Sequence, residues 1–195
     1  HDEMRVELMA GQFLDVYEQT RSAHTVERAL TIARYKSGKY TIERPLHFGA
    51  AMATTDKKVL ADVTSHYSSY GLPLGEAFQL RDDILGTFGD TARTGKPVGD
   101  DLREGKPTPI LAVAHERATP TQLQTLERIG CLDLSLDEIL AIQAVFTDTG
   151  ALAEIESSIS QLTAQAIKAL EIIDVSTEAC QALEALAVYV GTRDL

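Results

Sequence analysis

Two adjacent aspartates, Asp82 and Asp83, interrupt an otherwise apolar stretch, FQLRDDILGTFGD, that begins at Phe78. Aspartate is a weak helix former because its short side chain competes for backbone hydrogen bonds, and it is rarely buried without a partner. On a helix, the spacing of Gln79, the two aspartates and Gly86 places all four on one face. A carboxylate row suits a hard divalent cation such as Mg²⁺, which takes oxygen ligands. From this stretch alone, a solvated helix face is the alternative.

The segment after this helix concentrates positive charge. It contains Arg93, Lys96, Arg103 and Lys106, and both lysines stand in Gly-Lys-Pro frames. Glycine lets a backbone approach an anion closely, and lysine supplies a point charge. Neither frame has the glycine spacing, or the Ser or Thr after the lysine, of a nucleotide-binding P-loop. Two such frames behind a paired-aspartate helix predict a site for Mg²⁺ and a diphosphate, although either frame alone would be read as a surface turn.

Two weaker features precede the aspartates. Gln12 and Asp15 share one face of the first predicted helix, and Lys36 and Ser37 stand at the end of the next one. A cation at a helix C-terminus is favoured by the helix dipole. Each feature is also compatible with a purely structural role, so both are candidates only in combination with the aspartates.

Helical periodicity runs through almost the whole chain, without sustained alternation of apolar and polar residues. The sequence therefore predicts an all-α fold, with residues 1–195 as a single helical domain and a polar loop at about 90–109. Leu72–Pro73 is expected to separate two helices, because proline removes a helical hydrogen bond. Ser135 and Glu138 form a capping box. Further helices are expected at 110–118, 121–129, 136–147, 151–172 and 177–190.

Composition excludes some function classes. The formal net charge of −11 and pI of about 4.8 argue against nucleic acid or an anionic membrane surface as the main partner. No apolar run approaches the roughly 18 residues of a membrane span, so no integral membrane segment is expected. Cys131 and Cys180 are far apart and lack metal-ligand spacing. With the acidic start HDEMRVEL, which is unlike a signal peptide, they indicate a cytoplasmic protein.

Four blocks resemble, in order, the motifs of the trans-isoprenyl diphosphate synthases, also called polyprenyl synthetases: GQFLD (11–15), YKSGKY (35–40), FQLRDD (78–83) and TGKPVGDDLREGK (94–106). The last two are most similar to bacterial short-chain members that make geranylgeranyl or farnesyl diphosphate. The resemblance implies an isoprenoid-synthase-type helical bundle and a homodimer. It also implies condensation of isopentenyl diphosphate with an allylic diphosphate, with the help of several Mg²⁺ ions.

The resemblance assigns roles to single residues. Asp82 and Asp83 would bind Mg²⁺, Lys36 and Lys96 would neutralise the diphosphate, and carbonyl groups near Lys36–Ser37, with Gln79, would face an allylic cation. Asp100 and Asp101 are expected to be supporting groups of the loop. The residues implied in catalysis are Lys36, Ser37, Gln79, Asp82 and Asp83; those implied in substrate binding are Gln12, Asp15, Lys36, Gln79, Lys96 and Lys106.

The sequence departs from the family pattern in two ways. Gly86 stands where a third aspartate of the motif is expected. Asp90 follows Asp83 by seven residues, which is roughly 10 Å along the helix axis, so it could help only through water or a second ion. No other paired-aspartate helix precedes residue 78, so we expect the C-terminal part of a longer enzyme, with little activity alone. The alternatives are a non-catalytic subunit of a heteromeric prenyl synthase and a class I terpene cyclase, against which 6% aromatic residues and no tryptophan argue.

Overall fold

The computed structural model describes residues 1–19, 25–89 and 98–193. This part of the chain is helical and contains no strand, which confirms the all-α prediction. The helices, in chain order, are α1 (Asp2–Gln19), α2 (Val26–Ala33), η1 (Arg34–Glu43), α3 (Arg44–Ala53), α4 (Lys57–Phe88), α6 (Asp100–Glu104), α7 (Pro109–Arg117), α8 (Pro120–Leu126), α9 (Leu136–Asp148), α10 (Ala151–Ala169), η2 (Leu170–Ile172) and α11 (Thr177–Thr192). None of the described helices is both long and apolar enough to cross a membrane.

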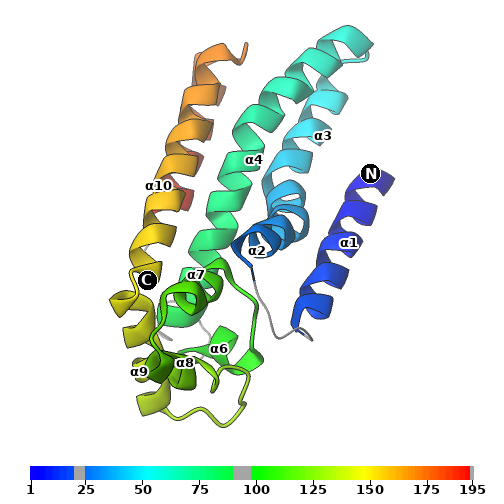
Figure 1. The fold of residues 1–195 in the computed structure, drawn as a ribbon. Coiled ribbons are helices and arrows are strands. Elements are labelled where there is room, and N and C mark those ends of the chain that lie inside the picture. Colours follow the sequence, from blue (N-terminus) through cyan, green and yellow to red (C-terminus); the bar gives the residue numbers. More distant parts are fainter. Residues whose placement is uncertain (20–24, 90–97, 194–195) are drawn as a thin grey trace.

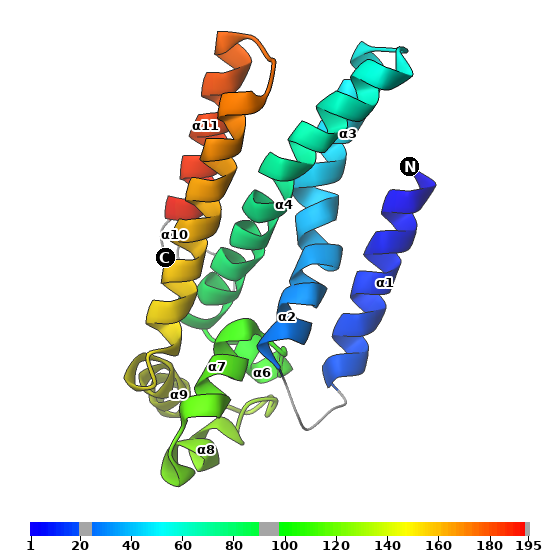
Figure 2. The ribbon, with the colours of Figure 1, turned by 45° about the horizontal axis from the view of Figure 1, so that its top comes forward.

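The long helices lie side by side, and the short helices α6 to α9 gather at one end (Figure 1). α4 is central: α10 packs along it, the α2–η1–α3 segment packs beside it, and α1 packs against η1. α11 returns along α10 (Figure 2). The core therefore follows α4, whose side chains Tyr70, Leu74, Leu80 and Ile84 are almost fully buried.

η1 is a π-helical segment that joins α2 to α3 without a break. The prediction that Lys36 stands at a helix end is therefore wrong: Lys36 lies inside a continuous helix. The backbone N–H of Arg44 donates to the carbonyl of Lys39, the five-residue step of a π-helix. π-Helical segments are rare overall, but those that occur are often found at functional sites, because the extra residue shifts the register of side chains and carbonyl groups.

The expected break at Leu72–Pro73 is also wrong, because α4 continues through Pro73. A proline inside a helix costs about 3 kcal/mol. Burial offsets this cost: Pro73 is buried, and Leu74 and Ala77 beside it are fully buried against neighbouring helices. Asp56 caps the start of α4 by accepting hydrogen bonds from the N–H groups of Lys58 and Val59.

Glycines set the spacing between α1, η1 and α4. A Cβ added at Gly75 of α4 would lie 2.5 Å from the carbonyl oxygen of Gly38 in η1, far inside normal contact. A Cβ added at Gly11 of α1 would lie 2.5 Å from the backbone nitrogen of Lys36. The backbones of α1 and α4 thus both approach η1 directly, and side chains from all three can meet.

The polar loop contains a helix that the sequence did not predict. α6 (Asp100–Glu104) is a single short turn, and the glycines at its two ends, Gly99 and Gly105, are left-handed with φ of 71° and 67°. Glycine adopts this conformation without the steric cost that other residues pay. Leu102 is buried under this turn, which anchors α6 to the core.

Candidate functional site

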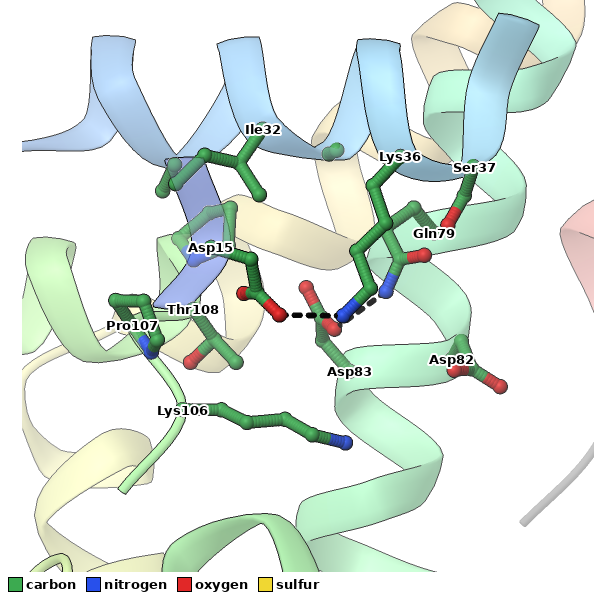
Figure 3. Close-up of a pocket in the computed structure, with 13 residues that line it drawn as sticks. Asp15, Ile32, Lys36, Ser37, Gln79, Asp82, Asp83, Lys106, Pro107 and Thr108 are labelled. Carbon is green, nitrogen blue, oxygen red and sulfur yellow. Dashed lines mark hydrogen bonds and ion pairs between the residues drawn. The ribbon is translucent and has the colours of Figure 1, made fainter. Parts of the chain in front are cut away.

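A cavity of about 140 Å³ lies near the C-terminal end of α4, where α4 meets α1, η1 and the segment after α6 (Figure 3). It brings together seven of the residues predicted from the sequence. These are Asp15 of α1, Lys36 and Ser37 of η1, Gln79, Asp82 and Asp83 of α4, and Lys106. The remaining lining is Ala29, Ile32, Ala33, Pro107, Thr108 and Pro109.

On the α1 and η1 side of the cavity, the Lys36 ammonium group donates to Asp15, with 2.6 Å between Nζ and Oδ2. Both side chains are mostly buried. The contact depends on Gly11, one turn before Asp15, because only glycine lets α1 come this close to the backbone of η1. Asp15 therefore holds the Lys36 ammonium group at the cavity (Figure 3).

On the α4 side, the two aspartates differ. Asp83 is buried, 7% exposed, and accepts a 2.7 Å hydrogen bond from Gln79 Nε2, whereas the Asp82 side chain is 49% exposed. Burial raises the pKa of Asp83 to about 7; the hydrogen bond from Gln79 and the charge of Lys106 oppose this, and the charges of Asp101 and Asp82 add to it. The site thus has one carboxylate in its wall and one open to solvent.

Lys106 comes from the segment after α6 and reaches the cavity from the side opposite Lys36 (Figure 3). Its ammonium group forms an ion pair and hydrogen bond with the buried carboxylate of Asp101. Burial alone would lower the pKa of Lys106, but the hydrogen bond and the charge of Asp101 raise it overall. Lys106 therefore remains a cation at the cavity and also ties α6 to it.

The sequence prediction missed Arg193, which follows α11. Its guanidinium group lies 4.2 Å from the centre of the Phe78 ring, and its Nη2 donates to the Phe78 carbonyl at 2.9 Å. Its Nη2 is 3.9 Å from Asp82 Oδ1. No sequence signal pointed to this contact, because it joins residues more than 100 positions apart through tertiary packing.

Some predicted residues are not brought to the cavity. The Gln12 side chain is exposed and is not among the cavity residues, although Asp15 on the same helix is. Lys96, Asp90 and Arg93 lie outside the described residues, so their roles remain predictions. Within residues 1–19, 25–89 and 98–193, no three His, Cys, Asp or Glu side chains are grouped closely enough to hold a metal ion by themselves.

Comparison with known proteins places this geometry in a family. The Polyprenyl synthetase family model matches residues 1–146. The chain belongs to the polyprenyl synthetase family. This confirms the family, and with it the isoprenoid-synthase fold, that the four sequence blocks indicate.

The chain is also similar in sequence to prenyl diphosphate synthases from other organisms. The chain is 33% identical over 156 residues to the geranylfarnesyl diphosphate synthase of Aeropyrum pernix, which covers 80% of this chain and 46% of that protein. It is 33% identical over 116 residues to the geranylgeranyl diphosphate synthase of Saccharolobus solfataricus, covering 60% and 33% of the two chains.

Solved structures show the same fold. A geranylgeranyl pyrophosphate synthase from Corynebacterium glutamicum, crystallised with isoprenyl diphosphate and magnesium, superposes with a TM-score of 0.90 at 42% identity. The match covers 98% of this chain and 53% of that one. The chain therefore spans about half the length, or less, of the relatives that it matches.

Proposed function

We propose that the protein supplies one wall of the active site of a trans-prenyltransferase, which condenses isopentenyl diphosphate with an allylic diphosphate to give a short-chain prenyl diphosphate. The observation that carries the proposal is that acidic and basic side chains line the same cavity. Asp82 and Asp83 lie on α4, and Lys36 and Lys106 reach the same space from η1 and from the segment after α6. Carboxylates beside ammonium groups suit an anion that arrives together with a divalent cation.

The cavity residues suit an Mg²⁺ ion that is coordinated by both the protein and the substrate. Mg²⁺ usually keeps several waters and meets one or two carboxylates plus substrate phosphates, not an all-protein cage. Asp82 and Asp83 would hold it, and the lack of a third grouped acid in the described part of the chain agrees with such a shared site. When bound, Mg²⁺ supplies positive charge that stabilises diphosphate as a leaving group.

The chain's own residues would prepare the allylic substrate for ionisation. Lys36 and Lys106 would bind the diphosphate oxygens, which take the electron pair when the bond to the allylic carbon breaks. The hydrogen bond from Gln79 Nε2 to Asp83 fixes the amide and leaves its carbonyl oxygen available to face the allylic cation. Carbonyl groups of the π-helical segment near Lys36 and Ser37 would add negative dipole ends on the same side.

The double bond of isopentenyl diphosphate would then form the new carbon–carbon bond to the cation. Loss of a proton from the adjacent carbon, accepted by the departing diphosphate, restores a double bond, so no protein nucleophile is required. The sequence offers none in a Ser-His or Cys-His arrangement. Binding of isopentenyl diphosphate, completion of the site by residues beyond this half-length match, and a homodimer are all parts of the proposal.

An assay of the full-length gene product with farnesyl diphosphate, isopentenyl diphosphate and Mg²⁺ tests this function. We expect a longer prenyl diphosphate, lost on chelation of Mg²⁺ and in Asp82→Ala. Asp62→Ala is the matched control, because Asp62 is an exposed aspartate of the same helix. Absence of any prenyl product from the wild type would reject the enzyme in favour of a non-catalytic subunit, and normal turnover by Asp82→Ala would reject the metal role.

A further inference from the structure

A π-helical segment as long as η1 requires stabilising contacts from other elements. π-Helical hydrogen bonding is rare and usually covers a single turn, whereas η1 runs over Arg34–Glu43. Its last turn closes with the five-residue step from the Arg44 N–H to the Lys39 carbonyl. Because each extra residue offsets the helix before the turn from the helix after it, contacts that favour this step also set how Lys36 and Ser37 face the cavity.

Glu7 of α1 contacts both residues that this step joins. Lys39 Nζ donates to Glu7 Oε1 at 2.5 Å, and Arg44 Nη2 donates to the same oxygen at 2.7 Å. Arg44 Nε donates to Glu7 Oε2 at 2.8 Å, so the contact with Arg44 is bidentate. Hydrogen bonds of this kind are strong because donor and acceptor are both charged. The three side chains are only 17–21% exposed, so salt screens these contacts less than it screens surface ion pairs.

The shared carboxylate depends on the π-helical step. In an α-helix, residues five apart point about 140° away from each other around the axis, so Lys39 and Arg44 would face different directions. In a π-helix they lie one turn apart on the same side, because each N–H reaches the carbonyl five residues back. Both cations can then approach the one carboxylate of Glu7. The side-chain contact and the backbone step therefore stabilise each other.

The C-terminal end of η1 is fixed to α4. Glu43 is 4% exposed, and its Oε1 accepts a 2.6 Å hydrogen bond from Ser68 Oγ. A Cβ added at Gly71 would lie 2.9 Å from the Cα of Glu43, so the backbones of α4 and η1 are in direct contact there. If the last π-turn became α-helical, this end could not rotate. Lys36 and Ser37, which precede the turn, would instead rotate by up to about 100°, the angle of one residue in an α-helix.

We propose that Glu7 is a positioning residue for the diphosphate cavity. By holding Lys39 and Arg44 on one carboxylate, it selects the π-helical form of η1 and so sets the direction in which η1 presents Lys36. Glu7 is not among the cavity residues and lies about two turns, or about 12 Å, before Asp15 on α1. The effect on diphosphate binding rests on the proposed function, whereas the effect on the helical form of η1 does not.

The first test compares crystal structures of the full-length gene product and its Glu7→Gln variant. Glutamine keeps the size of the side chain but carries no charge, so it no longer holds two cations together. We expect the Arg44 N–H to donate to the Lys39 carbonyl in the wild type. In the variant it should donate to the Tyr40 carbonyl, which is the four-residue step of an α-helix. An unchanged five-residue step in Glu7→Gln would overturn the inference.

The second test measures the binding of inorganic pyrophosphate with Mg²⁺ by calorimetry, together with the melting temperature of each variant. Glu7→Gln should bind about tenfold more weakly, because η1 presents the Lys36 ammonium group in another direction. Ile159→Val, in the core of α10, is the control for stability and should lower the melting temperature without changing the affinity. Glu3→Gln removes an exposed carboxylate one turn earlier on α1 and should match the wild type in both measurements.

The outcomes separate this inference from the proposed function. If Glu7→Gln binds pyrophosphate as the wild type does, or loses no more affinity than Ile159→Val, Glu7 stabilises the fold without positioning the cavity and the inference is wrong. An equal loss in Glu3→Gln would also overturn it, because the loss would then reflect net charge alone. If the wild type binds no pyrophosphate with Mg²⁺, the proposed function fails, while the two crystal structures still decide whether Glu7 selects the π-helical step.

Discussion

Gly75→Ala should separate η1 from α4 and thereby damage both stability and the site. The added Cβ would meet the backbone of Gly38, with 2.5 Å to its oxygen and 2.7 Å to its carbonyl carbon, whereas ordinary contact begins near 3.4 Å. Backbone atoms cannot rotate away as a side chain can. The two helices must therefore move apart by about 1 Å.

Overpacking of this kind costs about 1–3 kcal/mol, from which the better helix propensity of alanine returns up to about 1 kcal/mol. The net cost is therefore up to about 3 kcal/mol. At about 2–4 °C per kcal/mol for a chain of this size, we expect the melting temperature to fall by up to about 12 °C. The same displacement moves Lys36 and Ser37 relative to Gln79 and Asp83, and a misplacement near 1 Å can reduce turnover about 100-fold.

Thermal unfolding followed by circular dichroism provides the measurement, and two glycine variants provide the controls. A Cβ at Gly49 of α3 would meet no atom within 4 Å, so Gly49→Ala should be neutral or stabilising by up to about 1 kcal/mol. A Cβ at Gly38 would approach Gly75 only to 3.3 Å, so Gly38→Ala should cost less than Gly75→Ala. If Gly75→Ala melts at or above the temperature of Gly49→Ala, the close helix contact is not as described.

Three further changes should have distinct results. Glu7→Gln should remove the stability that the wild type loses as pH falls from about 4.5 to 2, because the hydrogen bond from Arg44 is the main cause that lowers the pKa of Glu7 to about 2 in the folded state. Urea unfolding across this pH range measures the loss, and the same dependence of unfolding free energy on pH in the variant and the wild type would contradict the prediction. Asp83→Asn should raise the melting temperature at pH 8 but not at pH 4. Burial raises the pKa of Asp83 to about 7, so the folded wild type loses stability as pH rises from about 4 to 7 and the carboxyl group ionises. Equal changes in melting temperature at both pH values would contradict this prediction. Arg193→Ala should lower the free energy of unfolding by about 1–2 kcal/mol and speed amide hydrogen exchange in α11, because the hydrogen bond to the Phe78 carbonyl and the stacking on the Phe78 ring are lost. Unaltered exchange in α11 would show that Arg193 does not anchor this helix.

The sequence predicted which residues meet at the cavity better than it predicted the backbone that holds them. Paired aspartates and nearby lysines are readable because residue type and helical spacing are local properties, and seven predicted residues do line one cavity. The continuation of α4 through Pro73 was not readable. It depends on burial by other helices, and tertiary packing overrides the local cost of proline.

The missed features share a cause. α6, the π-helical character of η1 and the arrival of Arg193 beside Asp82 all depend on contacts between distant parts of the chain. The close approach of the Asp101 side chain to Gly86 is of the same kind, because only the fold brings these two positions together. Gln12 shows that helical spacing alone can also predict too many site residues. It shares a helix with Asp15, but its side chain is exposed and does not line the cavity.

The central claim is that α4, η1 and the segment after α6 form one wall of a site for diphosphate and a divalent cation. A crystal structure of the full-length gene product with inorganic pyrophosphate and Mn²⁺, which replaces Mg²⁺ and gives an anomalous signal, tests it most directly. We predict an anomalous peak within bonding distance of the Asp82 or Asp83 carboxylate and phosphate oxygens within hydrogen-bond distance of Lys36 Nζ. Pyrophosphate and Mn²⁺ bound elsewhere, with neither aspartate near the metal, would contradict the claim.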